Sequence, residues 1–160
     1  MSAIPSEFLK RFEPFMQEAP INVAACAKAV GLTIYAIDLP AGVSGMIRRD
    51  SVKGGESGFV CYVDKSEPST RQRFTAAHEL GHFVLHRDVI GETHQDNYLL
   101  RAEGLSNAQE AEANRFAADL LMPRRLISDA MANGNDTVSE LCSLFRVSPT
   151  AMSIRLGLPT

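Results

Sequence analysis

The sequence lacks an excess of basic charge, a secretory leader and an apolar run of membrane-spanning length. Its 16 lysines and arginines against 19 acidic residues leave a net charge of −3, which is not the basic footprint of a non-specific nucleic-acid binder. The N-terminal stretch MSAIPSEFLKRFEPF carries charges in every turn, unlike the apolar core of a signal peptide. No stretch approaches the roughly 20 apolar residues of a transmembrane helix. We therefore expect a cytoplasmic protein with no membrane partner.

Cysteine is scarce as well. Cys26, Cys61 and Cys142 are far apart, lie in apolar segments and show no C-x-x-C spacing. This pattern predicts reduced, buried thiols rather than a disulfide framework or a cysteine metal site. The remaining composition, 45% hydrophobic and 22% charged over 160 residues, is typical of a soluble globular domain with a full core.

One stretch carries a pattern typical of hydrolytic chemistry. Residues Arg71 to Arg87, RQRFTAAHELGHFVLHR, predict one buried helix that contains HELGH. Residues four apart share a helix face, so His78 and His82 can present two imidazoles to one metal ion. Glu79 lies about 100° further round the helix, where it can reach a metal-bound water without being a ligand. We expect zinc, while manganese suits the same donors.

Such a pentapeptide also arises by chance, and the alternative is a core helix whose histidines only satisfy their own nitrogens. Burying Glu79 and three histidines without partners would be costly, and a metal ion removes that cost. The context favours burial, because the helix is apolar nearly all round. Its apolar residues are Phe74, Ala76, Ala77, Leu80, Phe83, Val84 and Leu85.

The flanking residues predict a small sheet beside this helix. Two short amphipathic helices are expected at residues 5–17 and 20–30. Three β-rich runs follow at 32–39, 43–50 and 58–64, separated by Pro and Gly, which suggests a three-stranded antiparallel sheet. A strand edge beside the metal helix is where a zinc peptidase would hold an extended substrate by backbone pairing.

Two capping boxes predict where the site helices begin. Ser69 with Gln72 is expected to start the HELGH helix, and Ser106 with Gln109 to start a second helix that ends before Pro123.

Between these helices, residues 88–105 are polar and predict an irregular loop over the site. His94, Tyr98 and Arg101 lie in it and are candidates to contact the substrate or to stabilise an oxyanion. The alternative is that each is an ordinary loop residue.

The second helix offers two candidates for a third metal ligand. A catalytic zinc takes three protein ligands and keeps one position for water. At about 100° per residue, Glu110 falls on the apolar stripe of the helix, whereas Glu112 falls on a charged face. A carboxylate on an apolar stripe needs a partner, so we expect Glu110 to be the ligand and Glu112 a solvated charge. Asn114, one turn after Glu110, is expected to hydrogen-bond a ligand.

His86 lies four residues beyond His82 but is a poor third ligand. Each four-residue step drifts by about 40°, so His86 falls about 80° from His78. We expect it to support a ligand or to cap the core rather than to bind the metal.

The C-terminal part has the pattern of a helix-turn-helix, with helices expected at 137–145 and 149–156. The second of these offers only Arg155 to reach bases or phosphates, so it is a weak DNA reader. We expect a domain at 1–125 and a C-terminal helical segment at 126–160 that packs on it or docks a partner.

Taken together, RFTAAHELGHFVLH, EAEANRFAADLLMP and the strand region before them resemble the ImmA/IrrE family of metallopeptidases over most of residues 20–158. The resemblance implies a zincin-like α+β fold, with a small antiparallel sheet packed against a central HExxH helix, a second ligand-bearing helix and a C-terminal helical pair. Carried over, His78 and His82 are ligands, Glu79 is the base and Glu110 the acidic ligand.

The resemblance also implies limited, site-specific cleavage of a repressor-type or antitoxin-like DNA-binding protein by a bacterial or phage enzyme. One position departs from the pattern: Asn114 stands where such proteins often have Asp, and an amide accepts a hydrogen bond without adding charge. Two other functions stay open, a non-catalytic zincin-fold regulator that binds a partner or DNA, and a component of a toxin–antitoxin pair.

Overall fold

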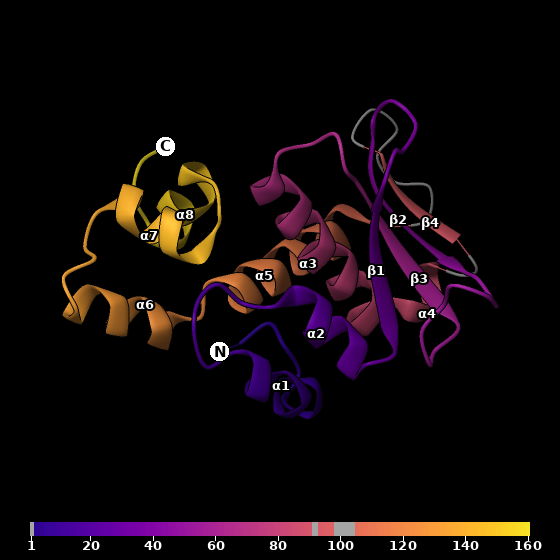
Figure 1. Ribbon diagram of the computed structural model, residues 1–160, viewed down its shortest axis with the longest axis horizontal. Helices are drawn as coiled ribbons and strands as arrows, with labels where there is room; N and C mark the ends of the chain where they lie inside the picture. The colour runs from indigo at the N-terminus through magenta and orange to yellow at the C-terminus, as the bar shows by residue number, and fades with distance from the viewer. Residues whose placement is uncertain (1, 91–92, 98–104) are drawn as a thin grey trace.

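The computed structural model describes residues 2–90, 93–97 and 105–160, and it has helices packed on one face of a mixed sheet (Figure 1). The α+β class expected from the sequence is confirmed. In chain order the elements are α1 (Ser6–Phe12), η1 (Glu13–Phe15), α2 (Val23–Ala29), β1 (Leu32–Ile37), β2 (Val43–Arg49), β3 (Phe59–Asp64), α3 (Ser69–Leu85), α4 (Arg87–Ile90), β4 (Thr93–Asn97), α5 (Asn107–Leu121), α6 (Arg124–Ala132), α7 (Val138–Phe145) and α8 (Pro149–Arg155).

The sheet differs from the expected antiparallel one. Its order is β1-β3-β2-β4, in which β1 runs parallel to β3 and the other pairs are antiparallel. The apolar strand FVCYVD of β3, buried over its first five residues, takes an interior place between β1 and β2. β1 and β2 lie on opposite sides of β3, and β1 runs in the same direction as β3.

A fourth strand was not expected. β4 comes from the stretch 88–105, which the polar sequence predicted to be an irregular loop, and its backbone pairs with β2, with His94 opposite Ile47. The sequence of β4, THQDN, has no apolar alternation. β4 forms because its backbone pairs with the edge of β2, and this pairing does not require a hydrophobic pattern in β4 itself.

α3 is the centre of the molecule, as its apolar character predicted. It packs against β1, β2 and β3 on one side and against α5 on the other, and every residue from Thr75 to Phe83 is buried (Figure 1). The two helices approach closely at Gly81, where an added Cβ would lie 3.1–3.2 Å from atoms of Phe116. Glycine is therefore what allows α5 to lie this near to α3.

The capping box predicted at Ser69 is wrong. Pro68 takes the N-cap position, so Ser69 is already the first helical residue and makes no capping bond. The Gln72 side chain turns back instead and donates to the carbonyl oxygens of Glu67 at 2.8 Å and Lys65 at 3.3 Å. These bonds fasten the turn that leads from the sheet into α3.

The capping box predicted at Ser106 is confirmed. The Gln109 N–H donates to Ser106 Oγ at 3.2 Å, and the Ser106 N–H donates to Gln109 Oε1 at 2.9 Å. α5 ends at Leu121, just before Pro123. The register of α5 is thus set at both ends by local sequence.

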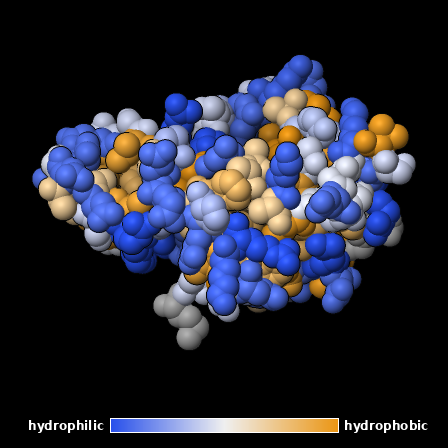
Figure 2. Space-filling view, turned by 60° about the horizontal axis from the view of Figure 1, so that its bottom comes forward, coloured by the Kyte–Doolittle hydropathy of each residue, from blue (hydrophilic) through white to orange (hydrophobic). Residues whose placement is uncertain are grey.

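The expected N-terminal helices are present but shorter than predicted, as α1 with η1 and as α2. Hydrophilic residues cover most of the face shown in Figure 2, where hydrophobic ones gather only in small patches. None of the helices within the described ranges is long and apolar enough to cross a membrane.

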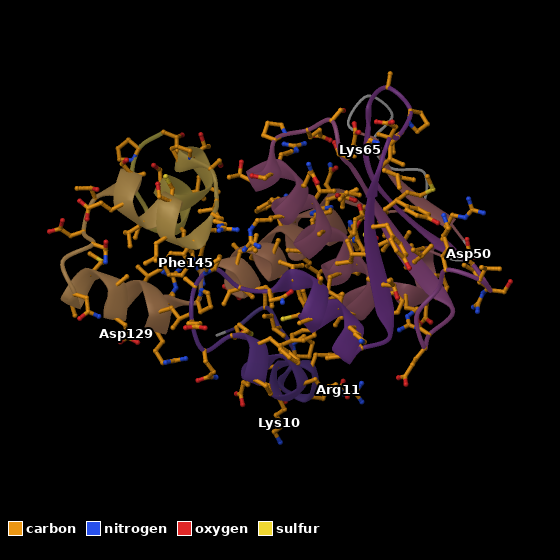
Figure 3. All side chains as sticks on the ribbon, in the orientation of Figure 1. Lys10, Arg11, Asp50, Lys65, Asp129 and Phe145 are labelled. Carbon is orange, nitrogen blue, oxygen red and sulfur yellow. The ribbon has the colours of Figure 1, made fainter. Side chains whose placement is uncertain are left out.

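α6, α7 and α8 form a group at the end of the molecule opposite the sheet (Figure 1). Phe145 lies inside this group and is fully buried, whereas Asp129 lies at its periphery (Figure 3). The buried apolar side chains run continuously from the sheet into these helices. The proposed division of the chain into 1–125 and 126–160 stays a prediction.

The close approach at Gly81 predicts that Gly81→Val destabilises the fold by about 1–3 kcal/mol, because the added methyl groups must displace Phe116 or the α5 backbone. Urea unfolding followed by circular dichroism measures this change. Ala108→Val, at an exposed position of α5, is the matched control and should cost no more than about 0.7 kcal/mol. Equal losses for the two variants would show that α3 and α5 have room to spare.

Candidate metal centre

Two histidines of α3 point to one place. His78 and His82 are one helical turn apart, and their Nε2 atoms lie 3.0 Å from each other. Both side chains are buried, His82 completely. Their rings meet edge to face, and the two Nε2 atoms converge on the same place.

Glu110 of α5 completes the cluster. Its Oε2 lies 3.2 Å from His78 Nε2, and its Oε1 lies 3.2 Å from His82 Nε2. The candidate ligand atoms of all three residues lie within 4.8 Å of one another. Hydrogen bonds from His78 and then His82 hold the pKa of the Glu110 carboxyl well below its ordinary value, so Glu110 is ionised near neutral pH.

Glu112 faces elsewhere. Its side chain is 45% exposed, and its nearest recorded partner is His86 Nε2 at 3.8 Å. The structure therefore brings Glu110, and not Glu112, to the two histidines, as the helical phase of α5 indicated. The Glu110 side chain, two residues earlier in the same helix, is only 19% exposed.

Each histidine of the pair has a second hydrogen bond on its other ring nitrogen. His78 Nδ1 lies 2.8 Å from Asn114 Oδ1, and His82 Nδ1 lies 3.0 Å from His86 Nδ1. An amide oxygen only accepts, so His78 Nδ1 carries a proton. A metal ion at the cluster would take the place of the hydrogen bond from His78 Nε2 to Glu110, and the neutral ring would then direct its Nε2 lone pair at the ion. This is the tautomer that a metal ligand needs.

His86 lies at the flank of the cluster, where its position in the helix placed it. Burial is the first cause that lowers the pKa of His86, which favours the neutral ring that can accept from His82. Its Nδ1 contacts His82 and its Nε2 faces Glu112. The geometry thus sets His86 behind a candidate ligand rather than among the ligands.

Glu79 lies beside the cluster in the most enclosed part of α3 and is fully buried. A Cβ at Gly45 of β2 would come within 3.1 Å of Glu79 Cγ and 2.7 Å of Thr75 Cγ2. Burial first, and then the charge of Glu79, raise the pKa of the Cys61 thiol in β3. β2 and β3 thus enclose the glutamate against α3.

Gly45 and Thr75 were missed as site residues by sequence reasoning. A glycine inside a predicted strand often marks a place where another element approaches closely. Gly45, inside the predicted strand 43–50, could therefore have pointed to the contact with α3. Thr75 carried no signal of its own, because its contact with β2 depends on how the sheet packs.

A cleft of about 1110 Å³ borders the cluster at His78 and Glu110 and extends between α3, α5 and α8. The C-terminal helices therefore form part of the surroundings of the site, a placement that sequence reasoning did not foresee. Of the other candidates, His94 belongs to β4, while Tyr98 and Arg101 lie outside the described residues.

The donor set fits a divalent metal ion. Two imidazole nitrogens and one carboxylate converge, and the tautomer of His78 and the ionised state of Glu110 leave lone pairs facing the same point. Two histidines and a glutamate suit zinc and also manganese.

The chain is similar to known proteins along most of its length. Residues 27–157 match a peptidase family described as the IrrE N-terminal-like domain. A radiation response metalloprotease IrrE of Deinococcus deserti is 34% identical over 103 residues, which cover 63% of this chain and 35% of that protein. The protein of the same name from Deinococcus radiodurans is 30% identical over 126 residues, covering 74% of this chain and 38% of that protein. The chain spans little more than a third of the length of these relatives.

A solved structure also shares the fold. A Mycobacterium tuberculosis transcriptional regulator superposes with a TM-score of 0.61 at 19% identity, over 97% of this chain and 48% of that one. The resemblance at this identity shows a common fold, which is consistent with the zincin-like architecture expected for α3 and α5. Because the family match runs from within α2 to beyond α8 and takes in both histidines and Glu110, the chain belongs to the IrrE N-terminal-like family of peptidases, as its resemblance to ImmA/IrrE proteins predicted.

Proposed function

We propose that this chain is the catalytic part of a metal-dependent endopeptidase. The observation that carries the proposal is the convergence of His78, His82 and Glu110 beside the buried Glu79. His78, His82 and Glu110 would hold a divalent ion, with zinc as the first choice and manganese as the alternative. Membership of a peptidase family supports the same reaction.

An ion held by His78, His82 and Glu110 would supply Lewis acidity for the hydrolysis of a peptide bond. Glu79 takes the proton of the attacking water and returns it to the leaving amine nitrogen. Its burial between α3 and the sheet excludes bulk water from the proton transfer. Asn114 and His86 hold the rings of His78 and His82 in the orientation that the reaction needs.

A purely structural metal site would leave Glu79 without a role. A fully buried glutamate beside three converging ligand atoms favours catalysis over the alternative function for this chain, that of a non-catalytic zincin-fold regulator. Membership of a toxin–antitoxin pair is compatible with peptidase activity and is not a competing mechanism.

We further propose limited cleavage of a regulatory DNA-binding protein, such as a repressor or an antitoxin-like partner, in the cytoplasm. The name of the relatives, radiation response metalloprotease, supports the cleavage of a protein. The outer edge of the sheet at β4 lies next to β2, whose Gly45 is beside Glu79, so an extended substrate could pair with this edge. The chain itself carries a net charge of −3 and is not expected to bind DNA directly.

Removing the acidic ligand should weaken metal binding far more than removing its exposed neighbour. We expect Glu110→Ala to raise the zinc dissociation constant by more than about 100-fold, the upper end of what losing a mere supporting hydrogen bond costs. Glu112→Ala should change it by less than about 3-fold, because that side chain is solvated. Competition with a fluorescent chelator measures both values. Similar losses in the two variants would contradict the assignment of Glu110.

The amide at position 114 predicts a graded effect on the same constant. Asn114→Ala should weaken zinc binding by about 10- to 100-fold, because His78 loses the acceptor that holds its ring. Asn114→Asp should bind zinc at least as tightly as the unchanged protein, since a carboxylate accepts the same hydrogen bond and adds charge. If Asn114→Asp behaves like Asn114→Ala, the hydrogen bond to His78 does not orient a ligand.

The general base is tested by Glu79→Gln, which keeps the shape of the side chain and removes its basicity. We expect zinc binding to persist and cleavage to fall by at least about 100-fold. The candidate substrates are the proteins encoded by the genes on either side of this one, and their fragments are followed by gel electrophoresis and mass spectrometry. Glu112→Gln, the same change at the exposed glutamate, should cleave normally. Undiminished cleavage by Glu79→Gln would reject the base assignment.

A further inference from the structure

The cleft that starts at the metal centre has three main walls, and Ser2, Ala3 and Arg124 complete its lining. α3 lines one from Thr70 to His78, α5 lines a second from Glu110 to Met122, and the third consists of α8 with the turn before it, from Val147 to Arg155. In Figure 1 the C-terminal helices lie across from the first turn of α3, and residues of both α8 and α3 line the cleft. At about 1110 Å³ the cleft is larger than most small-molecule pockets.

We propose that this cleft holds the substrate polypeptide next to the scissile bond and selects a segment that carries an acidic and an apolar side chain. The proposal rests on the proposed peptidase function for the nature of the occupant. What it adds is the chemistry of the substrate and a role for α8 as a specificity wall.

The acidic side chains of the cleft are already engaged. The two carboxylates that line it are Glu110, which contacts the paired histidines, and Asp119. Asp119 Oδ1 accepts from Arg155 Nη1 at 2.7 Å, with the Arg155 side chain only 9% exposed. Neither carboxylate is left to attract a basic substrate.

Two of the four arginines that line the cleft remain available, since Arg155 pairs with Asp119 and Arg124 donates to the Arg155 carbonyl. Arg115 of α5 is exposed and forms no ion pair with any residue that the structure describes. Arg71 of α3 contacts Glu67 at 3.3 Å, but the Arg71 side chain is 54% exposed and such a surface pair is worth little. The uncompensated charge that a ligand meets is therefore positive, which suits an acidic peptide.

An apolar surface lies in the same cleft. Ile154 projects from α8 with 66% of its surface exposed, although its neighbour Met152 is fully buried and holds the helix in place. Phe74 contributes from the α3 wall, where it is partly buried against the core. Covering Ile154 with an apolar substrate side chain would remove this surface from water.

The α8 wall is fixed before any ligand binds. Besides its pair with Asp119, Arg155 donates from Nε to the Met122 carbonyl at 3.0 Å. Arg73 of α3 donates to the Arg146 carbonyl in the turn between α7 and α8 at 3.3 Å. These bonds join the C-terminal pair to both site helices, so the cleft is preorganised.

The test is peptide binding to the zinc-loaded Glu79→Gln protein, which traps a substrate without cutting it. The probes are fluorescein-labelled decapeptides of Ser and Gly with Glu-Glu-Leu, Lys-Lys-Leu or Glu-Glu-Ser at the centre, followed by fluorescence anisotropy. We expect the first to bind about tenfold more tightly than the second and several-fold more tightly than the third.

Variants in the same background locate the two preferences. Arg71→Glu with Arg115→Glu should abolish or reverse the preference for Glu over Lys, while Arg125→Glu, on the exposed face of α6 outside the cleft, should not. Ile154→Ser should remove the preference for Leu over Ser. Leu158→Ser, at an exposed residue outside the cleft, is its control.

Three outcomes would overturn the proposal: binding that ignores the sign of the peptide charge, equal effects of the Arg115 and Arg125 changes, or a 20-base-pair DNA duplex that binds as tightly as the acidic peptide and depends on the same arginines. The last would make the cleft a nucleic-acid site. If the peptide preferences hold but the unmodified zinc-loaded protein cleaves neither these peptides nor the proteins of the neighbouring genes, the peptidase proposal fails while the binding specificity stands.

Discussion

The packing of α5 against α3 is the constraint on which the rest of the structure depends. Gly81 lets the two helices meet at Phe116, and this contact carries Glu110 to His78 and His82. A wider spacing would separate the Glu110 carboxylate from the Nε2 atoms of two buried imidazoles, and a buried polar atom without a partner is costly. The same contact between α3 and α5 therefore fixes both the packing of the two helices and the geometry of the candidate metal site.

The sheet and the C-terminal helices contact this helix pair at opposite ends. β2 encloses Glu79 through Gly45, where no side chain stands between strand and helix. At the other end, Arg155 and Arg73 join α8 and the turn before it to α5 and α3 by bonds to carbonyl oxygens and to Asp119. The site thus has a closed back at the sheet and an open cleft toward α8.

Sequence reasoning succeeded where the decisive interactions are local. The phase of α5 separated Glu110 from Glu112, and the box at Ser106 marked the start of that helix, because both depend on residues within one or two turns. It failed where distant segments decide. The order of the sheet could not be read from strands that each look alike. The box at Ser69 failed for a local reason, because the adjacent Pro68 already occupies the cap position.

The sequence by itself determined the family, the α+β class, the two helices of the site and the side chains that face one another across them. These follow from helical periodicity and from motif spacing, which are properties of short segments. Only the tertiary structure decided that β1 and β3 run parallel, that Gly45 closes the back of the site, and that α8 lines the cleft beside it. Those features depend on contacts between residues far apart in the chain, where each partner alone carries no signal of the other.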